Sequence, residues 1–143
     1  MSVDVLYTTS AEATGGRDGK SGTLDGALSV SLTTPKELGG SGGEGNNPEQ
    51  LFATGYAACF LGAMKFVAGN ESGFASVPED TTVRSTVGIG PRSEGGFGLE
   101  IALEVSLPGV DKQEAEKLVE RAHEVCPYSN ATRNNIDVKL SVA

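Results

Sequence analysis

Alternating apolar and polar residues predict strands in both halves of the chain. The clearest strand covers residues 99–107, where Leu, Ile and Val side chains alternate with Glu, Ala and Ser. The turn-rich segment 91–96 precedes it, so we expect a hairpin with the strand before that turn. Similar short patterns bounded by turn residues predict four further strands: 4–9, 28–32, 83–89 and 138–142.

A long helix is expected after the second strand. Pro48 suits its first position, with Asn47 as the N-cap and Glu49 in the first turn, and the helix would run to about Ala68. Residues 51–64 carry no charge and are apolar almost all round the helix. Such a helix is buried on all sides, inside a domain or at a subunit interface. A chain of 143 residues has difficulty surrounding it, so we expect an intimate homodimer.

A second helix follows Asp111, which can cap its start, and ends at Pro127. It is amphipathic, with apolar side chains between Ala115 and Cys126 on one face. The expected order is therefore β-β-α-β-β-α-β, with two main helices and largely antiparallel strands. This order is typical of the α+β class, and the length indicates a single domain over residues 1–143.

Composition and charge narrow the range of functions. The formal net charge is −8 at pH 7, which argues against nucleic acid or an anionic membrane surface as a partner. No basic segment followed by a long apolar stretch opens the chain, so we expect a cytoplasmic protein. The uncharged run 51–64 is short and interrupted by glycine, so we expect no membrane insertion. The glycine-rich segment 35–48 lacks the pattern of a P-loop, which favours a mobile loop over a phosphate site.

The two cysteines, Cys59 and Cys126, are the main candidates for chemistry. In a reducing compartment a structural disulfide is disfavoured, and a single histidine, His123, leaves too few soft ligands for a metal site. Each cysteine can instead be an inert small hydrophobic residue. A Cys–His hydrolase would use His123 as its base, but this histidine lies three residues before Cys126 on the same helix. The remaining interpretation is a pair of redox-active thiols, and their spacing leaves open whether the two meet.

A redox-active cysteine needs help to ionise. An ordinary thiol with a pKa of about 8.5 is only ~3% thiolate at pH 7, and burial in an apolar helix raises the pKa further. Cys59 lies too far into its helix for the helix dipole to act, so a cation must approach it. Arg17, in a glycine-flanked loop, is the candidate, and Glu49 can hold its guanidinium by a bidentate pair.

Three segments resemble the signature segments of the organic hydroperoxide resistance proteins, the Ohr branch of the Ohr/OsmC family. They are NPEQLFATGYAACF at 47–60, GGRDG at 15–19 and CPYSNATR at 126–133. The resemblance extends over essentially the whole chain, including GIGP at 88–91. It implies an OsmC-like α+β fold in a tightly intertwined homodimer, whose long helices lie between sheets built from both chains.

The resemblance also implies an activity and the roles of four residues. Members of the family are thiol-dependent peroxidases that reduce organic hydroperoxides, including fatty-acid hydroperoxides, to alcohols. By the matching segments, Cys59 would be the peroxidatic cysteine and Cys126 the resolving one, and the two would form a disulfide during turnover. Arg17 and Glu49 would orient and activate the Cys59 thiolate. No bound cofactor or metal is implied; the disulfide is typically reduced by an external dithiol, dihydrolipoamide, often carried on a lipoylated protein.

The positions of Glu49 and Cys59 add a geometric expectation. The two residues lie ten positions apart on one predicted helix, or ~15 Å along its axis. An arginine paired with Glu49 would have to bridge that gap to contact Cys59 of the same chain. We therefore expect Arg17 and Glu49 to reach Cys59 from the partner subunit, which gives two composite sites in each dimer.

Two other interpretations stay open. The OsmC branch shares the chemistry but differs in preferred substrates, and residues 56–60 and 126–129 favour the Ohr branch over it. A non-catalytic dimer could bind lipid in a buried apolar channel, with both cysteines as passive core residues. Several apolar side chains suit a greasy substrate tail, although core packing explains each of them singly: Phe52, Tyr56, Phe60, Met64, Phe74 and Phe97.

Overall fold

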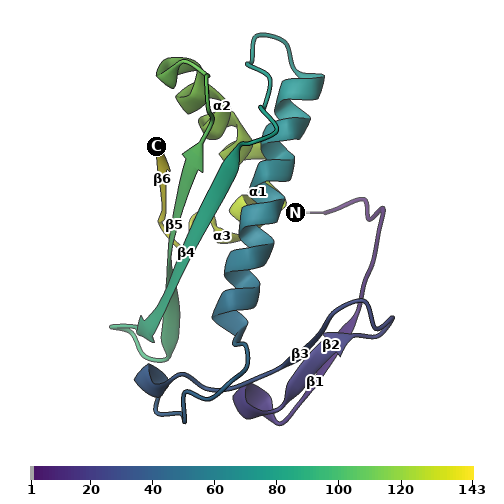
Figure 1. Cartoon of the computed structure of the whole chain (residues 1–143), viewed down its shortest axis with the longest axis vertical. Helices are drawn as coiled ribbons and strands as arrows, with labels where there is room; N and C mark the ends of the chain where they lie inside the picture. Colours follow the sequence, from purple (N-terminus) through teal and green to yellow (C-terminus); the bar gives the residue numbers. More distant parts are fainter. Residues whose placement is uncertain (1) are drawn as a thin grey trace. The chain divides into compact units, whose positions relative to one another are not determined.

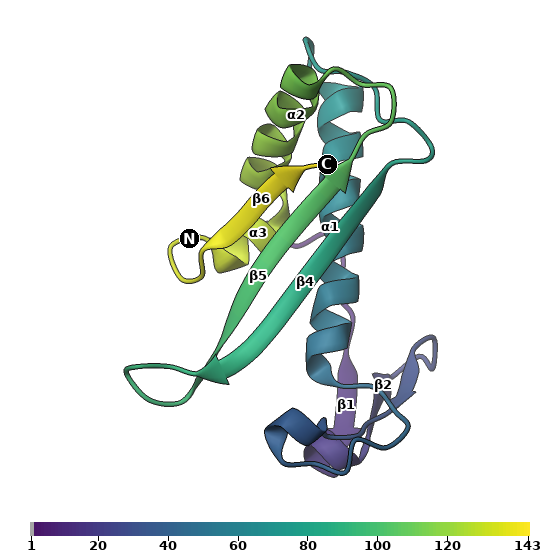
Figure 2. The same ribbon diagram turned by 60° about the vertical axis from the view of Figure 1, so that its left-hand side comes forward.

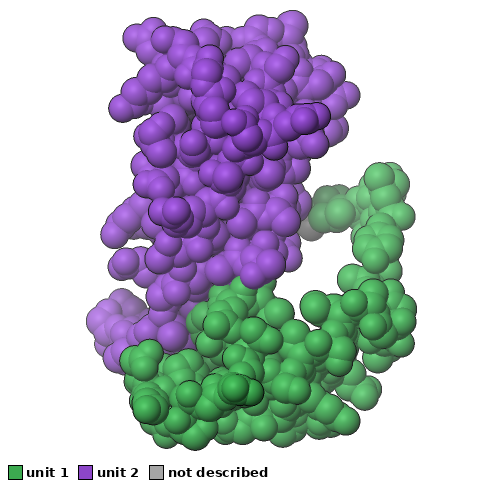
Figure 3. Space-filling view, viewed as in Figure 1, with its two compact units in different colours: residues 1–51 green, residues 52–143 purple. Residues whose placement is uncertain are grey.

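The computed structural model describes residues 2–143 and divides into two compact units, one ending at Leu51 and the other covering Phe52–Ala143 (Figure 3). Each unit contains its own three-stranded sheet. The single domain expected over residues 1–143 stays a prediction.

The first unit is built on an antiparallel sheet with the strand order β1-β2-β3. The sheet contains β1 (Ala11–Thr14), β2 (Lys20–Thr23) and β3 (Ser29–Ser31), and two 3-10 turns, η1 (Gly16–Asp18) and η2 (Lys36–Leu38), follow β1 and β3. The strand predicted at 28–32 is confirmed as β3. β2 is an addition, since its Ser and Gly residues resemble those of a turn.

The strand predicted at 4–9 is wrong. These residues form no strand in the described chain, and their side chains are exposed to solvent. A strand is stable only when its backbone N–H and C=O groups pair with a neighbour. The apolar alternation at 4–9 has no such neighbour among residues 2–143, so it produces no sheet there.

Helix α1 (Pro48–Asn70) begins where the sequence predicts. The Asn47 side chain accepts a hydrogen bond from the Gln50 backbone N–H (2.8 Å), and the Gln50 side chain accepts one from the Asn47 N–H (3.0 Å). This reciprocal capping box pairs backbone groups that the start of a helix leaves without partners. The predicted start is confirmed, and the helix ends at Asn70 rather than near Ala68.

The second unit packs its helices on one face of a second sheet (Figures 1 and 2). The strand order is β4-β5-β6, from β4 (Thr82–Pro91), β5 (Phe97–Ser106) and β6 (Val138–Val142). β4 and β5 form the expected antiparallel hairpin, whereas β6 runs parallel to β5. The other pairs among strands β1–β6 are antiparallel, so the sheets are largely antiparallel, as expected. A parallel neighbour needs a long crossover connection. Helices α2 (Lys112–Val125) and α3 (Pro127–Thr132) lie in that connection.

The α+β class with two main helices, α1 and α2, is confirmed. The element order differs from the expected one by strands β1 and β2, which lie outside the predicted ranges, by the lack of a strand at 4–9, and by the short helix α3 after α2. α3 has only six residues, too few for a helical period to show in the sequence. The predicted cap of α2 is present, because the Asp111 side chain accepts a hydrogen bond from the Gln113 N–H (3.2 Å).

The core of the second unit lies between its sheet and its helices. Ile101, Leu103 and Val105 alternate along β5 and have no exposed surface, as the pattern at 99–107 predicts. They belong to one apolar cluster with side chains of α1 and α2, including Phe60 and Leu118. Burying a side chain of this size contributes roughly 1.5–3 kcal/mol, so the cluster fixes the two helices on the sheet.

Helix α1 is covered only in part within one chain. Five of its 23 residues are buried: Tyr56, Phe60, Ala63, Met64 and Val67. Its length and a mean hydropathy of 1.5 in the most apolar window would suffice to cross a membrane. The apolar part of α1 is therefore longer than the uncharged run 51–64 indicates. Core helices of soluble proteins meet the same criterion, and the absence of membrane insertion stays a prediction.

Candidate active site

The second unit brings the two cysteines together. Cys59 lies on α1 and Cys126 between α2 and α3, 67 positions apart in the chain, yet their sulfur atoms are 3.6 Å apart. Both are free thiols; Cys126 is fully buried, and Cys59 is half-buried. The pair therefore lies at the edge of the core, with Cys59 as the more exposed of the two residues.

A proline fixes the position of Cys126. Pro127 has no N–H to continue the hydrogen-bonding pattern of α2, so α2 ends at Val125 and Pro127 starts α3 in the first helical position it favours. Cys126 itself has an extended backbone, with φ −64° and ψ 125°, and its N–H still bonds to the Ala122 carbonyl. The thiol is thus held at a rigid junction between two helices.

The surroundings of the pair hold Cys59 in its neutral form. Burial raises the pKa of the Cys59 thiol, and the contact with Cys126 raises it further. A hydrogen bond from the Tyr128 backbone N–H acts in the opposite direction and lowers this pKa, without reversing the result. Ionisation at neutral pH therefore requires a positive charge beyond these neighbours.

The first unit holds the predicted ion pair of Arg17 and Glu49. Arg17 Nη1 and Nη2 donate to the two carboxylate oxygens of Glu49 at 2.9 and 2.6 Å, which is the expected bidentate geometry. The hydrogen bond from Arg17 lowers the pKa of Glu49, and the same bond raises the pKa of Arg17. Both groups stay charged at neutral pH, and the Arg17 side chain keeps 36% of its surface exposed.

The turn that carries Arg17 is anchored from its other side. The Asp18 carboxylate accepts hydrogen bonds from the Thr34 backbone N–H (3.1 Å) and hydroxyl (2.9 Å). Two acidic residues therefore position Arg17. Glu49 orients the guanidinium, and Asp18 ties η1 to the segment after β3. The role expected for Arg17 and Glu49 beside a Cys59 thiolate stays a prediction.

His123 forms a hydrogen bond with Ser129, whereas a hydrolase base would contact a nucleophilic cysteine. Its Nδ1 lies 2.8 Å from the Ser129 hydroxyl oxygen, which in turn lies 2.7 Å from the Tyr56 hydroxyl. Tyr56 and Ser129 are fully buried. Ser129 is not among the residues that the sequence predicts for the site, and the signal that points to it is the helical turn that Pro127 can start.

The aromatic side chains expected around the site divide into two groups. Tyr56 and Phe60 have no exposed surface, which identifies them as core residues in this chain. Phe52 packs against Tyr56 and Tyr128 with ring centroids 6.1 and 6.2 Å apart, and Tyr128 is 41% exposed. Phe52 and Tyr128 thus form an apolar edge near the cysteine pair, whereas Phe97 is exposed at the start of β5.

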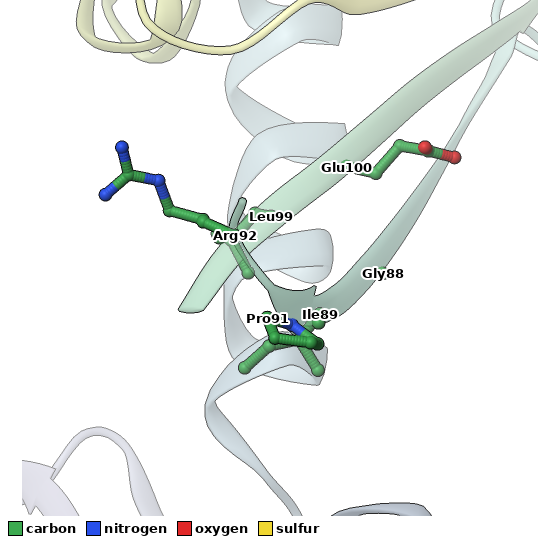
Figure 4. Close-up of a pocket in the computed structure, with 8 residues that line it drawn as sticks. Gly88, Ile89, Pro91, Arg92, Leu99 and Glu100 are labelled. Atoms are coloured by element: carbon green, nitrogen blue, oxygen red, sulfur yellow. The ribbon is translucent and has the colours of Figure 1, made fainter. Parts of the chain in front are cut away.

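A hollow on the β4–β5 hairpin lacks chemistry comparable to that of the cysteine pair (Figure 4). It has a volume of about 460 Å³ and is lined mainly by glycine and apolar residues between Gly88 and Glu100. Its two charged side chains, Arg92 and Glu100, extend away from each other. The cysteine pair is therefore the better candidate for an active site.

Comparisons with known proteins agree on one family. Residues 40–141 match the family described as OsmC-like protein. An organic hydroperoxide resistance protein of Xanthomonas axonopodis pv. citri is 56% identical over 139 residues, which cover 97% of this chain and 96% of that protein. These matches include both cysteine-bearing segments of the chain.

Solved structures agree with this result. An organic hydroperoxide resistance protein from Legionella pneumophila is 51% identical, with a TM-score of 0.90 and coverage of 98% of this chain and 99% of that chain. An organic hydroperoxide resistance protein from Vibrio cholerae, solved with captopril bound in one of its active sites, is 47% identical, with a TM-score of 0.90 and coverage of 99% and 95%. The chain therefore belongs to the OsmC-like family and, within it, to the organic hydroperoxide resistance proteins that its sequence segments resemble.

Proposed function

We propose that this protein is a cysteine-based, thiol-dependent peroxidase that reduces organic hydroperoxides, fatty-acid hydroperoxides among them, to alcohols. The observation that carries the proposal is the pair of free thiols, Cys59 and Cys126, with sulfur atoms 3.6 Å apart. The role in resistance to organic hydroperoxides for which the Xanthomonas relative is named supports it.

The chemistry needs two protein sulfurs and no bound cofactor. The Cys59 thiolate attacks the distal oxygen of the hydroperoxide, the O–O bond breaks, and the alkoxide leaves as the alcohol after taking a proton. Cys59 becomes a sulfenic acid. Cys126 then attacks the Cys59 sulfur, the S–O bond breaks, and water leaves with the proton of the Cys126 thiol. The resulting disulfide protects Cys59 from further oxidation to the sulfinic acid.

Arg17 is the cation proposed to stabilise the Cys59 thiolate, with Glu49 orienting it. Because α1 is one continuous helix, Glu49 and Cys59 lie about 15 Å apart along its axis. We infer that the Arg17–Glu49 pair of one subunit serves Cys59 of the other, giving two composite sites in a dimer.

A homodimer accounts for apolar surface that one chain leaves uncovered. Helix α1 buries only five of its 23 residues, and the segment before β1 exposes Val3, Val5, Leu6 and Tyr7, with Leu6 94% exposed. Exposed apolar surface of this extent is typical of an association site. A second copy that pairs with segment 4–9 and covers α1 would bury both.

Turnover requires a reductant from outside the chain. A dithiol such as dihydrolipoamide, free or on a lipoylated protein, would open the Cys59–Cys126 disulfide through a mixed disulfide and leave as a cyclic disulfide. A cytoplasmic location, with neither nucleic acid nor membrane as a partner, is part of the proposal. The acidic net charge of −8 supports the exclusion of nucleic acid.

Thiol counting after oxidation tests the proposal. Wild type and Cys59→Ser would be mixed with one equivalent of cumene hydroperoxide or hydrogen peroxide, and free thiols counted at quenched time points. We expect wild type to lose both thiols rapidly with cumene hydroperoxide and much more slowly with hydrogen peroxide. Cys59→Ser should lose none.

Two outcomes would contradict the proposal in different ways. Equal rates with the two oxidants would indicate a broad peroxidase without a preference for organic substrates. If neither thiol of wild type reacts, the cysteines are passive core residues, and a lipid-binding dimer becomes the better account.

A further inference from the structure

A chain of hydrogen bonds joins the two segments that carry the cysteines. The Tyr56 hydroxyl lies 2.7 Å from the Ser129 hydroxyl oxygen, which lies 2.8 Å from His123 Nδ1. Tyr56 precedes Cys59 by three positions on α1, so both lie on the same side of that helix. Ser129 follows Cys126 by three positions on α3. The contact between Tyr56 and Ser129 thus lies directly beside the contact between the two sulfurs.

The surroundings of this contact are closely packed, and the buried Thr132 hydroxyl lies 3.4 Å from the Tyr56 hydroxyl as a weaker neighbour. Tyr56 and Ser129 have no exposed surface. The Tyr128 ring packs edge-on against Tyr56, with centroids 5.7 Å apart, and lies so close to Gly55 that an added Cβ would be 3.1 Å from its hydroxyl. A buried hydrogen bond in such surroundings is directional, whereas apolar packing alone lets two surfaces slide. The Tyr56–Ser129 bond therefore defines the register of α3 on α1.

That register matters at one step of the proposed reaction. After Cys59 has become a sulfenic acid, Cys126 must bring its sulfur from 3.6 Å to bonding distance, an approach of about 1.5 Å. A second hydroperoxide competes for the same Cys59 sulfur and would oxidise it to the sulfinic acid. The competition is decided by how often Cys126 is in position, and not by how fast Cys59 first reacts.

We propose that Tyr56, Ser129 and His123 form a clasp that keeps Cys126 in position to resolve the Cys59 sulfenic acid, with Tyr56 as its positioning residue. The proposal rests on the peroxidase function proposed above. His123 holds the Ser129 hydroxyl from the α2 side, so the three side chains connect all three helices that meet at the cysteine pair. The clasp acts on disulfide formation and has no part in the attack on the hydroperoxide.

The test separates the two oxidation steps. Tyr56→Phe removes only the hydroxyl and keeps the ring. Ser129→Ala removes the Tyr56–Ser129 hydrogen bond from the other side, together with the bond between Ser129 and His123. Ser85→Ala is the matched control, since the Ser85 hydroxyl on β4 is also buried but has no hydrogen-bond partner among the described residues. Each protein would turn over cumene hydroperoxide with a dithiol reductant, and intact mass would give the fraction of chains that gain two oxygens.

A separate rate isolates the first step. In a Cys126→Ser background, with and without Tyr56→Phe, trapping of the Cys59 sulfenic acid by dimedone gives the rate of the first oxidation. We expect that rate to change less than about twofold. In the proteins with Cys126 intact, Tyr56→Phe and Ser129→Ala should raise the sulfinic fraction per turnover about tenfold over wild type, as loss of a buried hydrogen bond predicts. Ser85→Ala should match wild type.

The outcomes distinguish failure of the clasp from failure of the proposed function. If Tyr56→Phe and Ser129→Ala give the sulfinic fraction of Ser85→Ala, the clasp is refuted while the peroxidase stands. If Tyr56→Phe slows the first oxidation by as large a factor as it raises the sulfinic fraction, Tyr56 has a merely structural role, and the proposal is again refuted. If no sulfenic acid is trapped in the Cys126→Ser protein, the peroxidase function itself fails.

Discussion

At the level of single residues, Cys59 and Arg17 respond to burial in opposite ways: burial keeps the Cys59 thiol neutral, whereas Arg17 keeps its charge. Burial raises the pKa of Cys59 and so protects the thiol from adventitious ionisation. A guanidinium keeps its charge when it is desolvated, and Arg17 is already oriented by two hydrogen bonds to Glu49. In the proposed composite site, reactivity at Cys59 therefore depends on whether that cation is in place.

His123 gives the folded state a dependence on pH. Burial lowers the pKa of His123, nearby Arg133 lowers it further, and Glu124 opposes both. An unfolded histidine takes up its proton near pH 6.5, whereas the folded protein does so at lower pH. The unfolded state therefore binds more protons in this window, and stability falls as the pH drops below about 6.5.

The variant His123→Asn tests this pH dependence. Asparagine does not titrate, and its amide can still reach Ser129, so the hydrogen bond is kept while the protonation is removed. Between pH 7 and pH 5 we expect the Tm of wild type to fall more than that of His123→Asn, measured by circular dichroism in matched buffers. Parallel decreases in the two proteins would show that His123 does not titrate with unfolding.

At the scale of elements, the hairpin of β1 and β2 fixes the turn that holds Arg17. Gly19 closes this turn so tightly that an added Cβ would overlap the Thr14 carbonyl oxygen. A backbone neighbour cannot move aside as a flexible side chain can. Gly19 therefore has no room for a side chain. At Gly43, in contrast, an added Cβ would make only ordinary van der Waals contacts.

Gly19→Ala should uncouple Arg17 from the reaction. We expect a loss of about tenfold in the rate of Cys59 oxidation by cumene hydroperoxide, because forcing a backbone shift costs roughly 1–3 kcal/mol at the turn. Gly43→Ala is the matched control in the same unit. Diamide should still form the Cys59–Cys126 disulfide in both proteins, which reports an intact second unit. Equal peroxide rates in the two variants would contradict the role of the turn.

The sequence predicts elements well where a local rule decides them. Asn47 and Pro48 mark the start of α1, and the alternation at 99–107 marks a half-buried strand; both are confirmed because capping and side-chain period act within a few residues. Helix α3 and strand β2 depend on packing and pairing with distant segments, so their short sequences show no period. The same limit applies to the candidate site, since the 67 positions between the two cysteines say nothing of their contact.

At the scale of the whole molecule, the proposed exchange of residues between subunits can be tested by mixing two inactive proteins. Cys59→Ser and Arg17→Met would be denatured together and refolded. If Arg17 serves the partner's cysteine, each mixed dimer contains one intact site and one doubly defective site. Random pairing then restores about a quarter of the wild-type sites.

The control for this experiment is the same mixture without denaturation, in which subunits stay in their original dimers. We expect peroxidase activity only in the co-refolded sample, and size-exclusion chromatography should show a dimer in both. Failure of the co-refolded dimers to gain activity would place Arg17 and Cys59 of each site in one chain.

Burial of Cys126 decides which sulfur of a Cys59–Cys126 disulfide an incoming reductant meets. Cys126 has 0% of its surface exposed in a single chain, and association with a second chain can only reduce exposure. Thiol–disulfide exchange requires the attacking sulfur to approach along the S–S axis. An external thiol can therefore attack only at Cys59, and Cys126 is the leaving group. In a disulfide formed from this conformation, the oxidant and the reductant would use one opening and one sulfur in turn, so the opening that admits the hydroperoxide must also be wide enough for the reductant.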